Sequence, residues 1–155
     1  MSKSLKRVAR ALDEAGIVTE IVEVGQSRTA QEAADAVGCH LDQIAKSIIF
    51  RGEDSGTAIL FLTAGGNTVD TTKASAVAGE PLGKADAALI RAQTGFAIGG
   101  VAPVGHVSPI RAFLDPRLLT FSEVWAAGGT PRHVFAMDPA RLPDITGAEM
   151  ADFIA

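Results

Sequence analysis

Residues 94–106 restrict the folding of this chain more than any other segment, because four glycines and one proline interrupt an otherwise apolar run. Glycine reaches positive φ and lets a ligand approach the main chain, while Pro103 has a fixed φ and no amide hydrogen. We expect four apolar side chains to anchor the segment in a core: Phe96, Ile98, Val101 and Val104. The peptide groups of residues 99–105 would then be the polar atoms available to a ligand. The alternative is a tight sheet corner or bulge without a ligand.

The composition indicates one soluble domain spanning residues 1–155. With 47% apolar residues, a chain of 155 residues can bury one substantial core. The net charge of -4 argues against the basic surface of a DNA-reading protein, so a nucleic acid would have to be bound locally. The single cysteine, Cys39, excludes an internal disulfide, and the chain has neither a signal segment nor an 18-residue apolar run. We therefore expect a cytoplasmic protein with no membrane or DNA partner.

Apolar periodicity and capping residues predict helices and strands in irregular alternation. The predicted helices cover residues 5–15, 30–37, 71–78, 85–93, 121–126 and 146–154, with a short helical turn at 41–45. The predicted strands cover residues 17–24, 46–51, 57–63, 110–114 and 133–137, of which the second and third form a hairpin. This order favours an α+β domain with a strongly curved, barrel-like sheet, bent at its glycines and surrounded by helices.

Lys46 is a candidate functional residue at the start of a strand. Because side chains alternate along a strand, Lys46 shares a face with Ile48 and Phe50. Its ammonium group either reaches solvent at the sheet edge or projects into the mouth of a pocket, where it would hold a phosphate or a carbonyl oxygen. The spacing alone favours the first interpretation.

Other chemistry-bearing residues form no familiar motif. His106 closes the glycine segment and His133 begins a strand, so each is a candidate ligand contact. The histidines and Cys39 are too dispersed for a zinc pattern. The chain has no Gly-x-Ser-x-Gly elbow, no dinucleotide fingerprint and no Walker sequence, and we expect neither a metal nor a cofactor.

Three segments together resemble the YbaK family of prolyl-tRNA synthetase-associated editing domains. Residues 45–50 read Ala-Lys-Ser-Ile-Ile-Phe, and residues 65–70 read Gly-Gly-Asn-Thr-Val-Asp. Residues 94–105 read Thr-Gly-x-x-x-Gly-Gly-Val-x-Pro-x-Gly, which is the most specific of the three. The resemblance covers nearly the whole chain. It implies a mixed α/β domain with a curved sheet that hydrolyses mischarged aminoacyl-tRNA at or near prolyl-tRNA synthetase.

The resemblance also implies roles for particular residues. The family lysine falls on Lys46, which would bind the terminal phosphate or orient the carbonyl. The backbone of Gly99 and Gly100 would stabilise the oxyanion. The substrate-binding residues would be Val101, Ala102, Pro103, Gly105 and, across a variable loop, His133. The acceptor end of proline tRNA would carry cysteine, alanine or a similar small amino acid. Ala102 and Val104 stand where many members have serine and phenylalanine, so selectivity is expected to differ here.

Two other interpretations stay open from the residues themselves. The acidic net charge and the lack of a conventional nucleophile also fit a non-catalytic module that binds an aminoacyl-adenosine or related nucleotide and partners a synthetase. The third interpretation is an unrelated hydrolase that uses Cys39 as its nucleophile.

Overall fold

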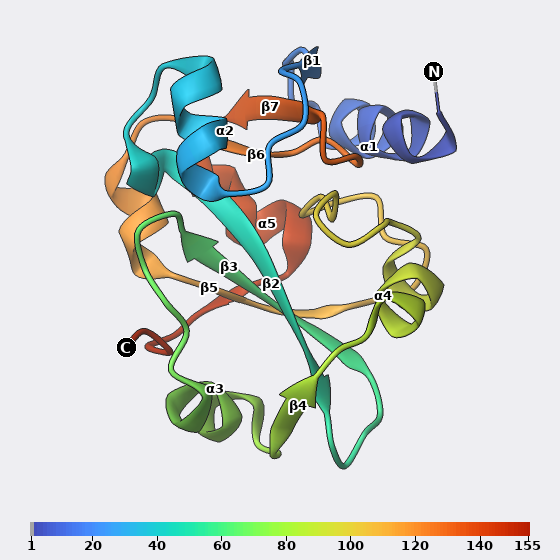
Figure 1. Ribbon diagram of the computed structural model, residues 1–155, viewed down its shortest axis with the longest axis vertical. Coiled ribbons are helices and arrows are strands. Elements are labelled where there is room, and N and C mark those ends of the chain that lie inside the picture. Colours follow the sequence, from blue (N-terminus) through green and yellow to red (C-terminus); the bar gives the residue numbers. More distant parts are fainter. Residues whose placement is uncertain (1) are drawn as a thin grey trace.

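A computed structural model describes residues 2–155, and within them eight strands form one mixed, curved sheet (Figure 1). The strands are β1 (Val22–Glu23), β2 (Ile44–Gly52), β3 (Ala58–Ala64), β4 (Leu82–Lys84), β5 (Arg111–Leu114), β6 (Val124–Ala127), β7 (His133–Met137) and β8 (Glu149–Met150). Their order is β1-β7-β6-β2-β3-β5-β8, with β4 paired to β2. The predicted α+β class and the curvature are confirmed, but within the described residues the sheet does not close into a barrel.

The β2–β3 hairpin is the centre of the sheet. Its two strands pair antiparallel from Ala45 with Ala64 to Arg51 with Ala58, and every residue of β3 is buried. Side chains of a strand alternate between its faces, so β3 contributes to two separate apolar clusters. Leu60 and Leu62 pack in the larger cluster, whereas Ile59 and Phe61 pack in a smaller one on the opposite face. Since both faces are covered, the hairpin is a well-packed support for the residues at the edge of β2.

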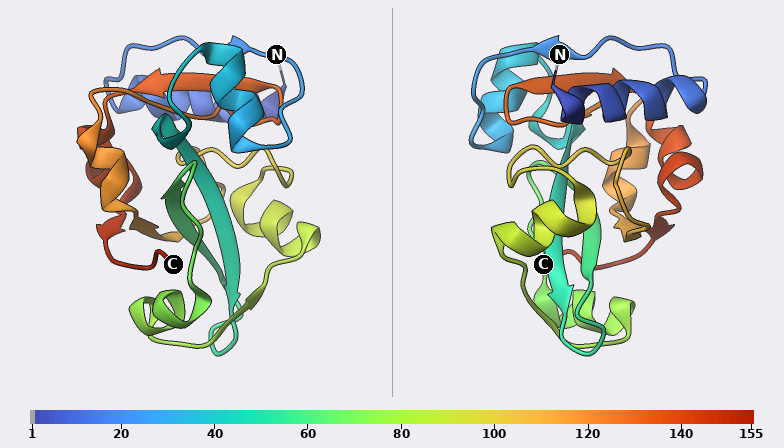
Figure 2. Two further views of the ribbon diagram at one scale, coloured as in Figure 1. Left: turned by 60° about the vertical axis from the view of Figure 1, so that its left-hand side comes forward. Right: turned by 90° about the vertical axis from the view of Figure 1, so that its right-hand side faces the viewer.

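Helices cover both faces and the upper end of the sheet (Figure 2). The α-helices are α1 (Lys3–Glu14), α2 (Ala30–Val37), α3 (Thr71–Ala78), α4 (Ala87–Thr94) and α5 (Leu142–Thr146). Three 3-10 helices, η1 (Leu41–Gln43), η2 (Pro116–Thr120) and η3 (Pro139–Arg141), join the strands. No helix within residues 2–155 has the length and apolarity needed to cross a membrane.

The edge of β2 opposite β3 has a gap in its pairing. There β6 pairs with β2 residues Ile44 and Ala45, and β4 pairs with residues from Phe50 to Gly52. Within the described residues, no strand pairs with β2 between these points, at residues 46–49. The gap places unpaired backbone of the central strand, together with Lys46, at an opening in the sheet.

Two predicted helices are wrong. Residues 121–126 were expected to be helical, but β6 runs through Val124–Ala127, with alternate residues buried and a parallel pairing to β2. Residues 146–154 were expected to form a closing helix, but Gly147 takes a φ of 71° and ends α5. Beyond it, Phe153 is fully buried in the smaller cluster. At residues 124–127 tertiary burial at period two overrides helical periodicity, whereas at residues 146–154 the left-handed Gly147 ends the helix.

Two further predictions need correction in detail. The strand expected at residues 17–24 is only the two residues of β1, because Val18 is fully exposed and lies outside the pairing with β7. Ile98 was expected to anchor the glycine segment, but it is 61% exposed, whereas Phe96, Val101 and Val104 are buried as predicted.

Candidate active site

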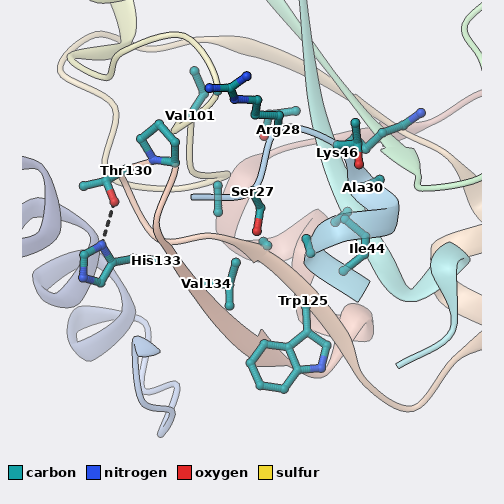
Figure 3. A pocket seen from close by; sticks show the side chains of 18 of the residues that line it. Ser27, Arg28, Ala30, Ile44, Lys46, Val101, Trp125, Thr130, His133 and Val134 are labelled. Carbon is teal, nitrogen blue, oxygen red and sulfur yellow. Dashed lines mark hydrogen bonds between the residues drawn. The ribbon is translucent and has the colours of Figure 1, made fainter. Parts of the chain in front are cut away.

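A cavity of about 440 Å³ opens at the gap in the sheet. Its lining comes from the segment before α2, from β2 and β6, from the glycine segment and from the turn before β7. Lys46 and Arg28 lie toward one end in Figure 3, and Trp125 lies toward the other. The cavity thus joins segments that are far apart in the sequence.

The lining carries positive charge on an acidic chain. Within residues 2–155, the cavity is lined by Lys46, Arg28 and His133 but by no aspartate or glutamate, although the chain as a whole carries a net charge of -4. Basic groups around a largely apolar cavity favour a ligand with negative charge or with developing negative charge. The formal charge of the lining residues therefore differs in sign from that of the whole chain.

Lys46 is half-buried at the edge of this cavity. Its Nζ donates a hydrogen bond to the carbonyl oxygen of Asn67 at 2.7 Å, which leaves two ammonium hydrogens for a ligand. Burial lowers the pKa of Lys46 below 10.5, and the negative charges of Asp115 and Asp42 oppose that shift. The sequence left two positions open for the Lys46 ammonium, one in solvent at the sheet edge and one at the mouth of a pocket. The structure combines them, because the ammonium is held near the surface while the side chain lines the cavity.

Two carboxylates fix the turn at residues 64–67, whose Asn67 carbonyl holds the Lys46 ammonium. The Oδ2 of Asp115 accepts hydrogen bonds from the Ala64 amide at 3.0 Å and the Asn67 side chain at 2.9 Å. Asp42 accepts from the Gly66 amide at 2.8 Å and from Arg117 Nε at 3.1 Å. Asp115 is only 2% exposed, so its charge is compensated mainly by these amide donors.

The glycine segment forms the facing wall with unpaired amides. Gly99 and Val101 line the cavity, and Gly99 takes a φ of 85°, which favours glycine. The Gly100 amide donates to the carbonyl of Ala97 at 3.0 Å, so it is already used. Within residues 2–155, the amides of Gly99, Val101 and Ala102 have no hydrogen-bond acceptor. Within the same residues the amides of Val104 and Gly105 are also unpaired, and of these five residues only Gly99 and Val101 line the cavity.

The N-terminal helix holds both ends of the glycine segment. Arg7 of α1 donates to the carbonyl of Gly95 at 2.5 Å and to that of Gly105 at 3.3 Å, and its guanidinium lies 4.9 Å from the centre of the Phe96 ring. His106 Nε2 is 2.7 Å from the carbonyl oxygen of Ala102. Because a carbonyl only accepts, this nitrogen carries the proton. Burial lowers the pKa of His106 from its ordinary value, which favours the neutral ring.

The predicted site residues fall into two groups. Lys46, Gly99, Val101 and His133 line the cavity. The other predicted residues, Gly100, Ala102, Pro103 and Gly105, lie outside its lining within the described residues, and Pro103 and Gly105 line a separate hollow beside α1 and α5.

Gly100 nevertheless determines the position of the wall. A Cβ atom at this residue would come within 2.7 Å of the Thr130 Cα, so only glycine allows the segment to pack this closely on the turn before β7. Gly100 therefore determines how closely the glycine segment packs on the turn before β7.

The histidine and cysteine candidates have different surroundings. His133 Nδ1 is 2.6 Å from the Thr130 hydroxyl, and its Nε2 is 3.5 Å from a Glu23 carboxylate oxygen. Cys39 packs beside Ala33, Ala34 and Ile44, and burial together with the charge of Glu123 raises the pKa of its thiol. A raised pKa disfavours the thiolate, so these surroundings argue against a Cys39 nucleophile.

Three lining residues were missed in the sequence. Arg28 precedes the N-cap of α2 and lines the mouth, and Trp125 lies on the strand that was mistaken for a helix. Ser47 lines the cavity, and within residues 2–155 its hydroxyl is the one buried side-chain polar atom without a hydrogen-bond partner. Only Ser47 carried a sequence signal, since strand alternation places a hydroxyl on an apolar face.

The fold and the cavity define an α+β domain whose site combines free backbone donors with a lysine, a combination suited to an oxygen-bearing ligand. The chain belongs to the aminoacyl-tRNA editing domain family, whose model matches residues 24–145. The match includes the hairpin, the glycine segment and β7, and confirms the resemblance found in the sequence.

Individual relatives agree with this assignment. One solved structure, a candidate trans-editing enzyme for prolyl-tRNA synthetase, is 48% identical, with a TM-score of 0.92 over 100% of this chain and 99% of the other. The hypothetical protein APE2540 is 26% identical, with a TM-score of 0.87 over 96% of this chain and 99% of the other. The uncharacterized protein YwhH of Bacillus subtilis (strain 168) is 32% identical over 77% of this chain and 76% of its own length.

Proposed function

We propose that the protein is a trans-editing deacylase that hydrolyses the ester between a small amino acid and proline tRNA. The observation that carries the proposal is the pairing of Lys46 with free amides of Gly99 and Val101 across one cavity. The ester to be cleaved has a carbonyl oxygen that becomes negative as water adds to its carbon. Donors on both walls would meet that charge.

The reaction needs no nucleophile from the protein. A water molecule adds to the ester carbon, and the free amides together with the Lys46 ammonium stabilise the oxyanion. The bond from carbon to the ribose oxygen then breaks, and the ribose oxygen takes up the proton that the added water gives up. A hydroxyl or thiol of the substrate itself orients the water. This route explains a site without an activated serine or cysteine.

Proline tRNA and prolyl-tRNA synthetase are the expected partners. The support is the 48% identity to a candidate trans-editing enzyme for that synthetase over the whole chain. Cysteine and alanine are the expected amino acids, since neither is larger than proline. Charging of tRNA occurs in the cytoplasm, where we expect the protein to act.

A panel of mischarged proline tRNAs tests the proposal. The purified protein should release cysteine, alanine or another small amino acid from at least one of them, and Lys46→Ala should slow the release about 100-fold or more. Lys84→Ala is the matched control, because Lys84 is exposed on β4 and away from the cavity lining. The proposal would be contradicted if the protein released no amino acid from any tRNA in the panel.

A non-catalytic binding module is the second candidate. It is favoured by the contact of Lys46 with the Asn67 carbonyl, which holds the ammonium at the edge of the cavity. Such a module would bind a non-hydrolysable aminoacyl-adenosine analogue yet leave the corresponding ester intact. Binding together with hydrolysis selects the deacylase.

A further inference from the structure

Arg28 is a cation at the cavity that the resemblance gave no role. Its side chain is exposed and lines the mouth, and in Figure 3 it extends on the side of Val101, away from Lys46. Within residues 2–155, its guanidinium forms no hydrogen bond or ion pair, unlike the paired guanidinium groups of Arg111 and Arg117. It is therefore available to a ligand at the rim.

The backbone around Arg28 is held on two sides. The Arg28 amide donates to the Glu32 carboxylate at 2.6 Å, and the Glu32 amide donates back to the Thr29 hydroxyl at 3.1 Å. One residue earlier, the Ser27 amide donates to the carbonyl of Pro131 at 3.3 Å. These bonds fix the base of the side chain beside the turn before β7. The Arg28 side chain therefore extends from a backbone that is held near the cavity.

Arg28 and Lys46 differ in burial and in geometry, and the difference suits two parts of one substrate. A phosphodiester keeps its charge and is costly to bury, so it is expected to stay at the solvent-exposed rim. A planar guanidinium matches two phosphate oxygens at once, whereas an ammonium acts as a point charge. The ester carbonyl is neutral before reaction and can enter the cavity, where half-buried Lys46 and the free amides lie.

We propose that Arg28 binds the phosphate that joins the last two nucleotides of the aminoacyl-tRNA, which leaves Lys46 to act at the ester carbonyl. This assignment rests on the proposed deacylase function and divides between two residues the two roles that the resemblance gave to Lys46. Arg28 is then a substrate-binding residue that determines affinity for a phosphate-bearing acceptor end.

The test compares a substrate that has this phosphate with one that lacks it. Arg28→Ala should lower kcat/KM on aminoacyl-tRNA about 10- to 100-fold, mainly through KM, because a charged bidentate contact is lost. On aminoacyl-adenosine, which ends at the ribose, the same variant should match the wild type. The slope of log(1/KM) against log salt should fall in magnitude by about 0.7, the value for one single-strand phosphate contact. Arg28→Lys should retain part of the wild-type kcat/KM on aminoacyl-tRNA, because it keeps the positive charge.

Arg91→Ala is the matched control, since Arg91 is exposed on α4 and away from the cavity lining. Equal losses on both substrates, or no loss on aminoacyl-tRNA, would overturn the assignment. If the wild type hydrolyses neither substrate, the proposed function has failed. The role of Arg28 is then decided by calorimetry with cytidylyl-adenosine and adenosine. Arg28→Ala should abolish a wild-type preference for the dinucleotide, and a wild type without that preference contradicts the proposal.

Discussion

The two walls of the cavity are supported by opposite chemistry. The glycine wall is formed by the glycine segment, and the lysine wall is formed by Lys46 and the turn that contains Asn67. On the glycine wall, side chains of Arg7 and His106 donate to backbone carbonyls, and neighbouring amides stay free. On the lysine wall, carboxylates of Asp42 and Asp115 accept from backbone amides, and the Asn67 carbonyl is left to hold Lys46. Behind the glycine wall, side-chain donors occupy the backbone carbonyls and leave amides free. Behind the lysine wall, carboxylates occupy the backbone amides and leave a carbonyl that binds the Lys46 ammonium.

This difference separates what each wall contributes. Backbone amides do not titrate, so the glycine wall should stabilise an oxyanion equally at every working pH. The lysine wall depends on the charge of Lys46, which changes with pH, and on the carboxylates of Asp42 and Asp115, which mutation can remove. Mutations behind each wall should therefore differ in their effects on stability, on rate and on pH dependence.

Asp115→Ala should have the largest effect on stability. It leaves the buried amide of Ala64 and the side chain of Asn67 without an acceptor and removes the cap of the Arg117 amide. We expect a loss of about 3 kcal/mol in the free energy of unfolding, measured by urea denaturation. Deacylation measured below the melting temperature should fall at least tenfold, since the turn that holds Lys46 is released.

The control for that experiment is Asp152→Ala, which removes an exposed partner of Lys73. Its free energy of unfolding should change by less than about 1 kcal/mol. If Asp115→Ala behaved like Asp152→Ala, the lysine wall would not depend on its buried carboxylate.

Gly100→Ala tests the glycine wall. The added Cβ would lie 2.7 Å from the Thr130 Cα and 2.8 Å from its carbonyl carbon, so the backbone itself must shift. We expect a stability loss of about 2 kcal/mol and a fall in kcat of up to about 100-fold, because the free amides move away from the oxyanion. Deacylation kinetics and thermal unfolding measure the two effects.

Gly83→Ala is a suitable comparison, because its Cβ would meet the flexible end of the Glu53 side chain, which can move. That variant should keep normal kinetics. A normal kcat for Gly100→Ala would show that the position of the glycine wall does not limit the reaction.

The sequence predicted the buried anchors of the glycine wall, apart from Ile98, better than the residues that support Lys46, for a physical reason. The glycines restrict the backbone locally, and the buried anchors Phe96, Val101 and Val104 are contiguous with them. The supports of Lys46 come from residues that share no local pattern with it, since Asp115 contacts Asn67 across 48 positions. Such a contact exists only after the chain has folded, so Asp115 could be predicted as a cap but not as a support of the turn.

The errors in secondary structure have a related origin. The helix expected at residues 121–126 followed apolar spacing that a strand pairing with β2 also satisfies, and that pairing depends on a partner about 80 residues away. By contrast, α2 begins after Thr29 and ends before Gly38 as predicted, because its caps are local. Arg28 was missed because nothing in its own segment indicates a distant cavity.

The pH dependence of the lysine wall should follow the charge of Lys46. Burial lowers its pKa below 10.5, so its contribution to activity should disappear as pH rises through that lowered value. In the same interval the unfolded chain binds the proton more tightly than the folded one, so the Lys46 contribution to stability rises with pH. The charge of Asp42 raises the pKa, and Asp42→Asn should therefore move the alkaline loss of ligand binding to lower pH.

Binding of a non-hydrolysable, amide-linked aminoacyl-adenosine measures this profile without alkaline hydrolysis of an ester. Asp152→Asn is the control, because its carboxylate lies beside Lys73 and does not perturb Lys46. An alkaline limb that stays in place in Asp42→Asn would assign it to a group other than Lys46.

Ser47→Ala should have the smallest effect, and its sign differs between stability and binding. The Ser47 hydroxyl is buried without a partner in the free protein, so its removal relieves a desolvation cost and should raise the free energy of unfolding by up to about 1 kcal/mol. A bound substrate that pairs with the hydroxyl would lose that bond, and KM should rise several-fold with little change in kcat. Ser75→Ala is a useful contrast, because the Ser75 hydroxyl already accepts from the Leu82 amide and its loss should destabilise the fold. If Ser47→Ala destabilises the protein and leaves KM unchanged, the hydroxyl serves the fold and not the ligand.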